Sequence, residues 1–194
     1  LSAGERIFSL IDEKPEITDQ PNATQFEQIK GEIVFKDVFF HYHADKPVLQ
    51  NLNLHIKAGQ SIALVGPTGH GKSTIANLIC RFYQLTSGSL TIDGMDYQTK
   101  TQQSLHRQLG IVLQTPHLFE GTIRDNVKYA IPEATDEQVI KALLLVGGEN
   151  FTTRLDEKVE SNGDNLSMGE RQIISFARAL IIDPRILIMD EATS

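Results

Sequence analysis

The chain has little cysteine: Cys80 is the only one among 194 residues. A single cysteine cannot form an intrachain disulfide, so we expect a protein that folds without disulfides and works in a reducing compartment. Because Cys80 directly follows Ile79, we interpret it as a packed thiol without a catalytic role.

Positive charge is also scarce, with 18 Lys and Arg against 25 Asp and Glu and a formal net charge of -7. General affinity for nucleic acid requires a basic face, so we expect no nucleic-acid partner. A ligand that carries a few phosphates needs only local donors, and the acidic balance does not exclude it.

Long apolar runs are missing, because Asp, Pro or Arg interrupts each one within a few residues. The sequence therefore predicts no membrane span, and its start has neither the basic head and apolar block of a secretory signal nor a methionine. We expect a soluble piece of a longer protein.

The stretch GPTGHGKST lies between an apolar run at 61–65 and a helical pattern at 72–83. A buried strand, a glycine loop and an amphipathic helix in this order favour a phosphate-binding loop over an ordinary turn with an exposed lysine. The glycines let backbone N–H groups form a nest for anionic oxygens, and the helix start adds further free N–H groups. Lys72 can reach the β- and γ-phosphates, and the Ser73 hydroxyl can bind Mg²⁺. The predicted nucleotide-binding residues are Gly66, Pro67, Thr68, Gly69, His70, Gly71, Lys72, Ser73 and Thr74.

The remaining periodicity predicts an α/β fold. Strands are expected at 32–42, 49–56, 61–65, 89–93, 110–113 and 186–189, and helices at 1–11, 72–83, 104–108, 135–146 and 167–182, with a linker at 12–22. The strands before the phosphate loop suggest a small antiparallel sheet, and Asp93-Gly94 is a hairpin signal. In the helix at 167–182, Glu170, Arg171, Ser175 and Arg178 are expected to face away from the core. Three buried strands end at Gly66, Gln114 and Asp190, and parallel sheets bind ligands at such ends, so we expect one shared crevice.

Polar side chains at those strand ends suggest chemistry. Asp190 can orient Mg²⁺ or one of its waters, and Glu191 can accept a proton from a water that attacks the γ-phosphate. Gln114 can complete the Mg²⁺ shell or be merely an exposed residue. Tyr42 can stack on adenine, and packing in the sheet is the equally weighted alternative.

The segment NLSMGERQ contains Ser167 and Glu170 in the spacing of a capping box. Helix initiation alone explains both residues, but a helix start with a serine and Gly169 is also an anion site. Since the chain already has a phosphate loop, we interpret this second helix start as serving a nucleotide held by another chain.

This set of motifs resembles the nucleotide-binding domain of an ATP-binding-cassette (ABC) transporter. GPTGHGKST is similar to Walker A, ILIMDE to Walker B, and LSMGE to the LSGGQ signature formed here by Leu166, Ser167, Met168, Gly169 and Glu170. Gln114 lies where the glutamine loop of the family would be, and Tyr42 lies where its adenine-stacking aromatic residue would be. The segment TPHLFEGTIRDNV resembles the corresponding segment of the exporter subgroup.

The resemblance implies a RecA-like P-loop core, mostly parallel, with an antiparallel β-subdomain and a helical subdomain at about 115–170. It implies that residues 1–30 link to a transmembrane domain of the same transporter and that 31–194 form the nucleotide-binding domain. It further implies ATP and Mg²⁺ as cofactors, catalysis by Glu191, Lys72 and Gln114, and metal binding by Ser73, Gln114 and Asp190. The partner that the resemblance implies for this chain is a second nucleotide-binding domain, identical or different. The two domains would form a head-to-tail dimer at the cytoplasmic face of the cell membrane.

Several residues depart from the family pattern. Met168 replaces a glycine and Glu170 a glutamine, which suggests a weakened or asymmetric site unless Glu170 turns back to cap its helix. Ser161 stands where exporters carry a glutamate, although Glu160 is adjacent. The family's switch histidine lies beyond Ser194, so residues 1–194 alone are expected to be a poor ATPase.

Two other functions fit parts of this pattern. A soluble cassette ATPase of DNA repair or translation would need a coiled-coil insertion or second cassette, and neither is visible. A regulatory module that binds ATP without turnover is compatible with the altered signature.

Overall fold

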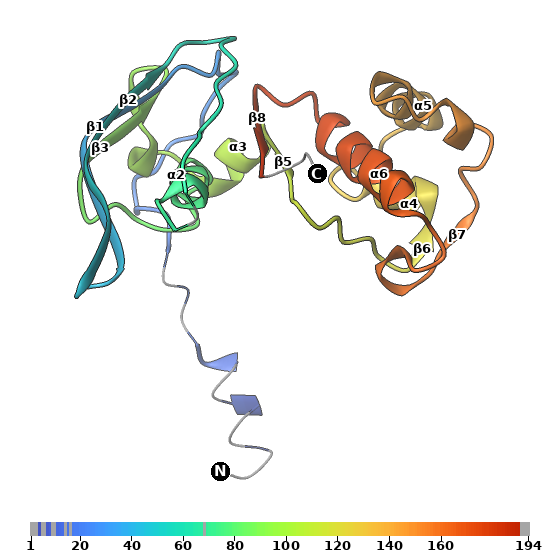
Figure 1. Cartoon of the computed structure of the whole chain (residues 1–194), viewed down its shortest axis with the longest axis horizontal. Coiled ribbons are helices and arrows are strands. Elements are labelled where there is room, and N and C mark those ends of the chain that lie inside the picture. The colour runs from blue at the N-terminus through green and yellow to red at the C-terminus, as the bar shows by residue number, and fades with distance from the viewer. Residues whose placement is uncertain are drawn as a thin grey trace.

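The structure, a computed structural model, describes residues 4, 7–8, 11–13, 15, 17–67 and 69–190. Figure 1 shows two lobes, with strands β5 and β8 lying between them. Most of the helix expected at 1–11 is outside the described residues, as are Thr68 and Glu191. Within the described part of the chain, no helix is long and apolar enough to cross a bilayer.

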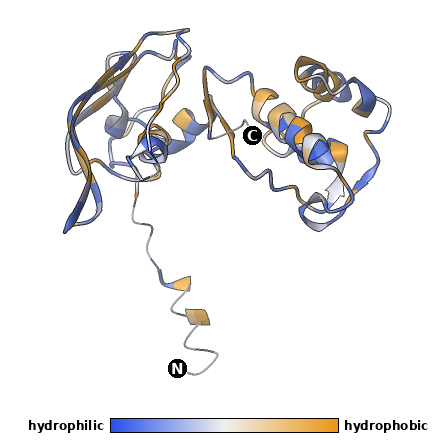
Figure 2. Ribbon diagram, in the orientation of Figure 1, coloured by the Kyte–Doolittle hydropathy of each residue, from blue (hydrophilic) through white to orange (hydrophobic). Residues whose placement is uncertain are grey.

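The first lobe contains a four-stranded antiparallel sheet in the order β2-β1-β3-β4. Its strands are β1 (Ile33–His43), β2 (Lys46–Ile56), β3 (Ser87–Ile92) and β4 (Met95–Asp96). Ile33 pairs with both Ile56 and Ile92, which sets the register across three strands. Both strands carry apolar and polar residues (Figure 2), and more and less buried positions alternate along parts of β1 and β2, so one face of the sheet can be buried. The predicted antiparallel sheet is confirmed.

Helix α2 (Lys72–Ile79) and helix α3 (Gln102–His106) lie against this sheet, with a 3₁₀ turn at Tyr97–Thr99 between them in sequence. The core of the lobe includes Leu78 and Leu90, which have no exposed surface. Phe26 and Ile29 also belong to this core, although they fall in the stretch 1–30 that was expected to be a linker.

The central parallel sheet contains β5 (Leu109–Val112) paired with β8 (Ile186–Met189). The expected strand at 61–65 is absent: these residues are exposed, and Val65 is 90% exposed. A strand needs a neighbouring strand to satisfy its backbone N–H and C=O groups, and no described strand pairs with 61–65. The prediction of a third buried strand was therefore wrong for the described residues.

The second lobe is mainly helical and has a separate apolar core that includes Val127, Leu143, Phe151 and Ile174. Its elements are β6 (Gly121–Thr122), α4 (Ile123–Lys128), α5 (Asp136–Leu145), β7 (Lys158–Val159), α6 (Met168–Leu180) and two 3₁₀ turns, Glu149–Phe151 and Ser161–Gly163.

Helix α6 is buried on more sides than its sequence suggested. Ser175 and Arg178 were expected to face away from the core, but Ser175 is buried and Arg178 Nε donates to the Asn126 carbonyl oxygen at 2.9 Å. The amphipathic pattern underestimated this burial because α6 packs against both α4 and α5.

Candidate functional site

The loop before α2 has the backbone expected of a phosphate nest. Gly69 and Gly71 both have φ of 83°, in the left-handed region that favours glycine. Gly71 is the N-cap residue of α2, and among the described residues no side chain caps this helix start. The first N–H groups of a helix have no intrahelical acceptor, so the start of α2 can receive an anion.

Lys72 lies across this loop. Its Nζ donates to the carbonyl oxygens of Gly66 at 2.7 Å and Pro67 at 3.0 Å. The ammonium is thus held at the loop by hydrogen bonds that phosphate oxygens can replace. His70 is exposed in the same loop.

The carboxyl end of β8 lies beside the loop. Ser73 Oγ donates to Asp190 Oδ2 at 3.4 Å, and the Asp190 amide donates to the Val112 carbonyl oxygen at 3.0 Å. Two hard oxygen ligands from α2 and β8 therefore stand together, which suits Mg²⁺ because this ion prefers oxygen and uses few protein ligands. Gln114 is exposed two residues after β5 ends, so it follows the strand paired with β8.

Tyr42 contacts the helix that begins at the phosphate loop. Its hydroxyl is 3.1 Å from Thr74 Oγ1, and Asn77 Nδ2 donates to that hydroxyl at 3.4 Å. The ring packs edge-to-face against Phe40 and Tyr83, and the residue remains 42% exposed. Tyr42 is therefore both a packed sheet residue and an exposed aromatic surface beside α2.

The signature segment begins α6 with a complete capping box. Ser167 Oγ accepts from the Glu170 amide at 3.3 Å, and Glu170 Oε2 accepts from the Ser167 amide at 3.0 Å and from its hydroxyl at 2.9 Å. These hydrogen bonds hold the pKa of Glu170 below its usual range. The predicted capping box is confirmed, and Glu170 turns back onto its own helix.

The rest of the signature is arranged around this cap. Leu166 is buried in the helical-lobe core, whereas Met168 is 51% exposed. A Cβ added at Gly169 would meet no atom within 4 Å, so the space outside this helix start is open.

Arg154 is a residue that the sequence analysis missed. Its Nη1 donates to Glu170 Oε1 at 3.4 Å, and it also pairs with Glu157. The two partners Arg154 and Glu170 lie 16 residues apart across a loop, so no helical spacing signalled the contact.

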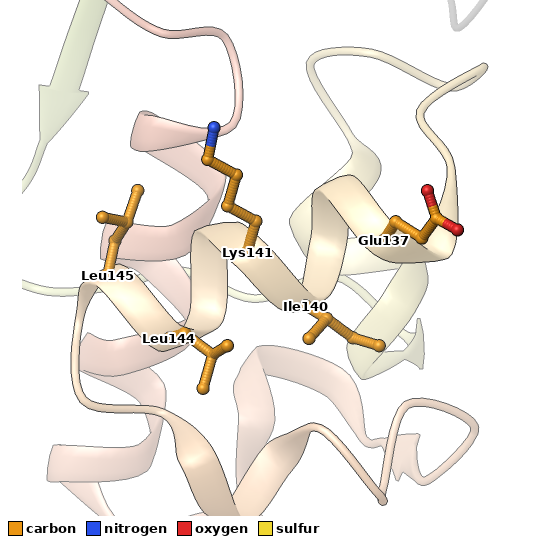
Figure 3. A pocket seen from close by; sticks show the side chains of 5 residues that line it. All are labelled: Glu137, Ile140, Lys141, Leu144 and Leu145. Carbon is orange, nitrogen blue, oxygen red and sulfur yellow. The ribbon is translucent and has the colours of Figure 1, made fainter.

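The two predicted phosphate positions do not form one site within the chain. Helix α2 belongs to the sheet lobe and α6 to the helical lobe, and α6 begins at its end away from β8 (Figure 1). A separate hollow of about 450 Å³ lies along the outer face of α5, between Glu137 and Leu145 (Figure 3). None of its five lining residues belongs to the predicted nucleotide-binding set.

The loop, the adjacent acid and the parallel strands define the chain as a P-loop NTPase with an antiparallel β-subdomain and a helical subdomain. The family described as ABC transporter matches residues 49–194. The chain belongs to this family.

Curated relatives are similar over the whole chain. An uncharacterised ABC transporter ATP-binding protein, YknV of Bacillus subtilis, is 46% identical over all of this chain and 33% of its own length. An ATP-dependent lipid A-core flippase of Desulfotalea psychrophila is 43% identical over all of this chain and 34% of its own length. A fatty acid ABC transporter ATP-binding/permease protein of Mycobacterium tuberculosis is 38% identical, with 100% and 31% covered. The chain thus spans about a third of these relatives.

A solved structure is also similar. It is a bacterial Atm1-family ABC exporter with ATP bound, with a TM-score of 0.91 and 39% sequence identity, covering 98% of this chain and 34% of that chain. At this identity, the likeness extends beyond the general fold.

Proposed function

We propose that this chain is the ATP-hydrolysing motor of a membrane exporter and converts ATP and water into ADP and phosphate. The observation that carries the proposal is the loop that joins Gly71, Lys72 and Ser73 to Asp190. Its open helix start and its ammonium offer donors to the triphosphate, and its two oxygen ligands suit the accompanying Mg²⁺.

In this proposal, Lys72 exchanges its contacts with the loop carbonyls for phosphate oxygens. Ser73 and Asp190 hold Mg²⁺, which supplies charge neutralisation at the phosphates when it is bound, and Gln114 completes its shell. Tyr42 stacks on the adenine with its exposed ring. Glu191, which follows Asp190 in sequence, accepts the proton of the attacking water.

The second phosphate position, at the start of α6, is proposed to serve a nucleotide bound by another nucleotide-binding domain. Its support is the placement of α2 and α6 in different lobes (Figure 1), so that the two helix starts do not face one ligand within the same chain. A head-to-tail pair, of identical or different chains, gives each loop a signature segment. The domain at 31–194, its helical subdomain at about 115–170 and the weak turnover by these residues alone remain predictions.

A membrane partner is proposed at a groove between the two lobes. A groove of about 1120 Å³ is lined by residues of α3, β5 and α6 and by the segment that follows α4. It is lined by Phe119 and Tyr129, whose rings stack with centroids 4.4 Å apart and which are 47% and 61% exposed. The relatives include an ATP-binding/permease protein of which this chain covers only 31%. We propose that a cytoplasmic segment of such a permease part occupies the groove, at the cytoplasmic face of the membrane.

The proposal is tested by Mg-ATP binding to the chain, measured by isothermal titration calorimetry. Replacing Lys72 with Ala removes a charged donor, and we expect about 10- to 100-fold weaker binding. Lys57→Ala is the matched control because Lys57 is also an exposed lysine and lies outside the loop. Equal binding by the Lys72 variant and the wild type, or no binding by the wild type, would overturn the proposal.

A further inference from the structure

The carboxylate of Glu170 stands at a helix start that the proposed function assigns to a nucleotide phosphate. The first N–H groups of α6, those of Met168 and Gly169, lack intrahelical acceptors and are the donors available to an anion. The Ser167 hydroxyl already donates to Glu170 Oε2 at 2.9 Å. A negative side chain within the first turn would repel a phosphate at the same place unless a positive group compensates it.

Arg154 supplies that positive group from outside the helix. Its Nη1 donates to Glu170 Oε1, while Ser167 occupies the other carboxylate oxygen, Oε2. Both oxygens of Glu170 are therefore directed back toward the chain. The side chain of Glu170 is only 28% exposed, so this ion pair is partly shielded from water.

The guanidinium of Arg154 is itself held in place. Its Nε and Nη2 donate to the two carboxylate oxygens of Glu157 at 2.6 and 2.8 Å, the planar two-point geometry in which an Arg–carboxylate pair is strongest. Its Cζ lies 5.3 Å from the centroid of the Phe151 ring, and Phe151 is fully buried. Because the guanidinium is already fixed in this way, its contact with Glu170 costs Arg154 little further side-chain entropy.

We propose that Arg154 is a positioning residue of the signature site. It holds the Glu170 side chain back against the helix start and compensates its negative charge, so that the nucleotide of a second copy of the chain can bind at the start of α6. The inference rests on the proposed function, because it requires a phosphate at that helix start. It replaces the expectation of a weakened site with a site whose altered residue is compensated.

A purely structural role for Arg154 makes a different prediction. If Arg154 only held the loop at 151–157 together, its removal would weaken the ATP-driven pairing of two chains by the same factor, whatever residue stood at position 170. If it compensates the Glu170 charge, its removal matters only while that charge is present.

The experiment is a double-mutant cycle on ATP-driven self-association of the chain, measured by analytical ultracentrifugation in Mg-ATP. The variants are Arg154→Met, which keeps an apolar stem over Phe151, Glu170→Gln, which keeps the cap, and the combination of both. We expect Arg154→Met to weaken pairing about tenfold or more, Glu170→Gln to leave it unchanged or stronger, and the double variant to match Glu170→Gln.

The matched control is Arg124→Met. Arg124 also forms ion pairs in the helical lobe, with Asp136 and Asp156, but it does not contact Glu170. It is expected to pair like the wild type. If Arg154→Met is too unstable to measure, Arg154→Lys and Arg154→Gln take its place. Arg154→Lys keeps the positive charge without the two-point contact, whereas Arg154→Gln leaves the Glu170 charge uncompensated. We expect the association of the Arg154→Lys variant to be closer to that of the wild type.

The outcomes separate the two proposals. Equal losses from Arg154→Met in the Glu and Gln backgrounds, or no loss in either, overturn the role of Arg154 while Lys72-dependent ATP binding still supports the proposed function. A wild type that binds ATP but does not pair also overturns the role of Arg154. A wild type that does not bind Mg-ATP overturns the proposed function and the inference with it.

Discussion

The two helices that begin at predicted phosphate positions, α2 and α6, satisfy their first N–H groups in different ways. Helix α2 starts at Gly71 without a side-chain cap from any described residue and without an acidic residue in its first turn. Helix α6 starts at Ser167 with a complete capping box and carries Glu170 in its first turn. The start of α2 therefore depends on a ligand for its acceptors, whereas the start of α6 is already stable without one.

This difference suggests a division of roles. A helix start that its own chain leaves uncapped can bind triphosphate tightly, and Lys72 adds a positive charge to it. A capped and acidic start is a weaker anion site by itself, so it needs compensation by Arg154. We expect substitutions at α2 to affect both folding and nucleotide binding, and those at α6 to affect mainly the interaction with a partner.

The largest effect is expected from Gly71→Ala. The residue has φ of 83°, and the added Cβ would lie 2.7 Å from Leu49 Cδ2, which belongs to a buried core side chain. The left-handed backbone costs about 1–2 kcal/mol and the overpacking about 1–3 kcal/mol more. The free energy of unfolding in urea and the affinity for Mg-ATP should both fall.

The control for this prediction is Gly59→Ala, because Gly59 also has positive φ, 72°, but a Cβ there meets no atom within 4 Å. In Gly59→Ala, the free energy of unfolding should fall only by the cost of the left-handed backbone, and the affinity for Mg-ATP should not change. Equal losses in the two variants would contradict the close approach of Gly71 to β2.

A smaller effect is expected from Ser167→Ala, which removes the cap of α6. Loss of an N-cap hydroxyl typically lowers the free energy of unfolding by about 1 kcal/mol, measured here by chemical denaturation. Thr135→Ala removes the equivalent cap of α5, whose box is completed by the neutral Gln138. Both variants should lose similar stability, but only Ser167→Ala should change ATP-driven pairing; a similar change after Thr135→Ala would remove the distinction between the two caps.

The smallest effect concerns pH. Hydrogen bonds from Ser167 and the ion pair with Arg154 lower the pKa of Glu170, so its stabilising contribution is complete above the unfolded value of about 4.3 and is lost as the pH falls through the lower folded value. A charge at a helix start contributes about 0.3–1 kcal/mol. Between pH 6 and pH 3, the wild type should therefore lose more stability than Glu170→Gln, by an amount in this range. Identical pH profiles would show that the Glu170 charge does not stabilise the folded chain.

The local motifs were predictable from the sequence because their physics is local. The glycine loop, the capping box of α6, and the turn at Asp93 and Gly94 each depend on residues a few positions apart. Asp93 and Gly94 indeed adopt positive φ of 50° and 74° between β3 and β4. The same reasoning failed for 61–65, since an apolar run becomes a strand only when another strand pairs with it.

Contacts between distant segments were not predictable in this way. Arg178 was expected to face solvent, yet it reaches Asn126 and lies 5.1 Å from the centroid of the Phe119 ring. Its guanidinium sits in a partly buried site that lowers its pKa. A helical pattern identifies the face with most apolar residues, but it does not show how many neighbours surround the helix.

By itself, the sequence determined which loop before a helix turns at left-handed glycines and which helix start caps itself, because glycine φ angles and i to i+3 capping contacts arise within one turn. Only the tertiary structure decided that Ser73 meets Asp190, that Tyr42 lies against α2, and that Arg154 faces Glu170. These contacts join segments that are far apart in the sequence and that no helical or strand spacing relates. The packing within the lobes, and not local propensity, therefore brings these side chains together.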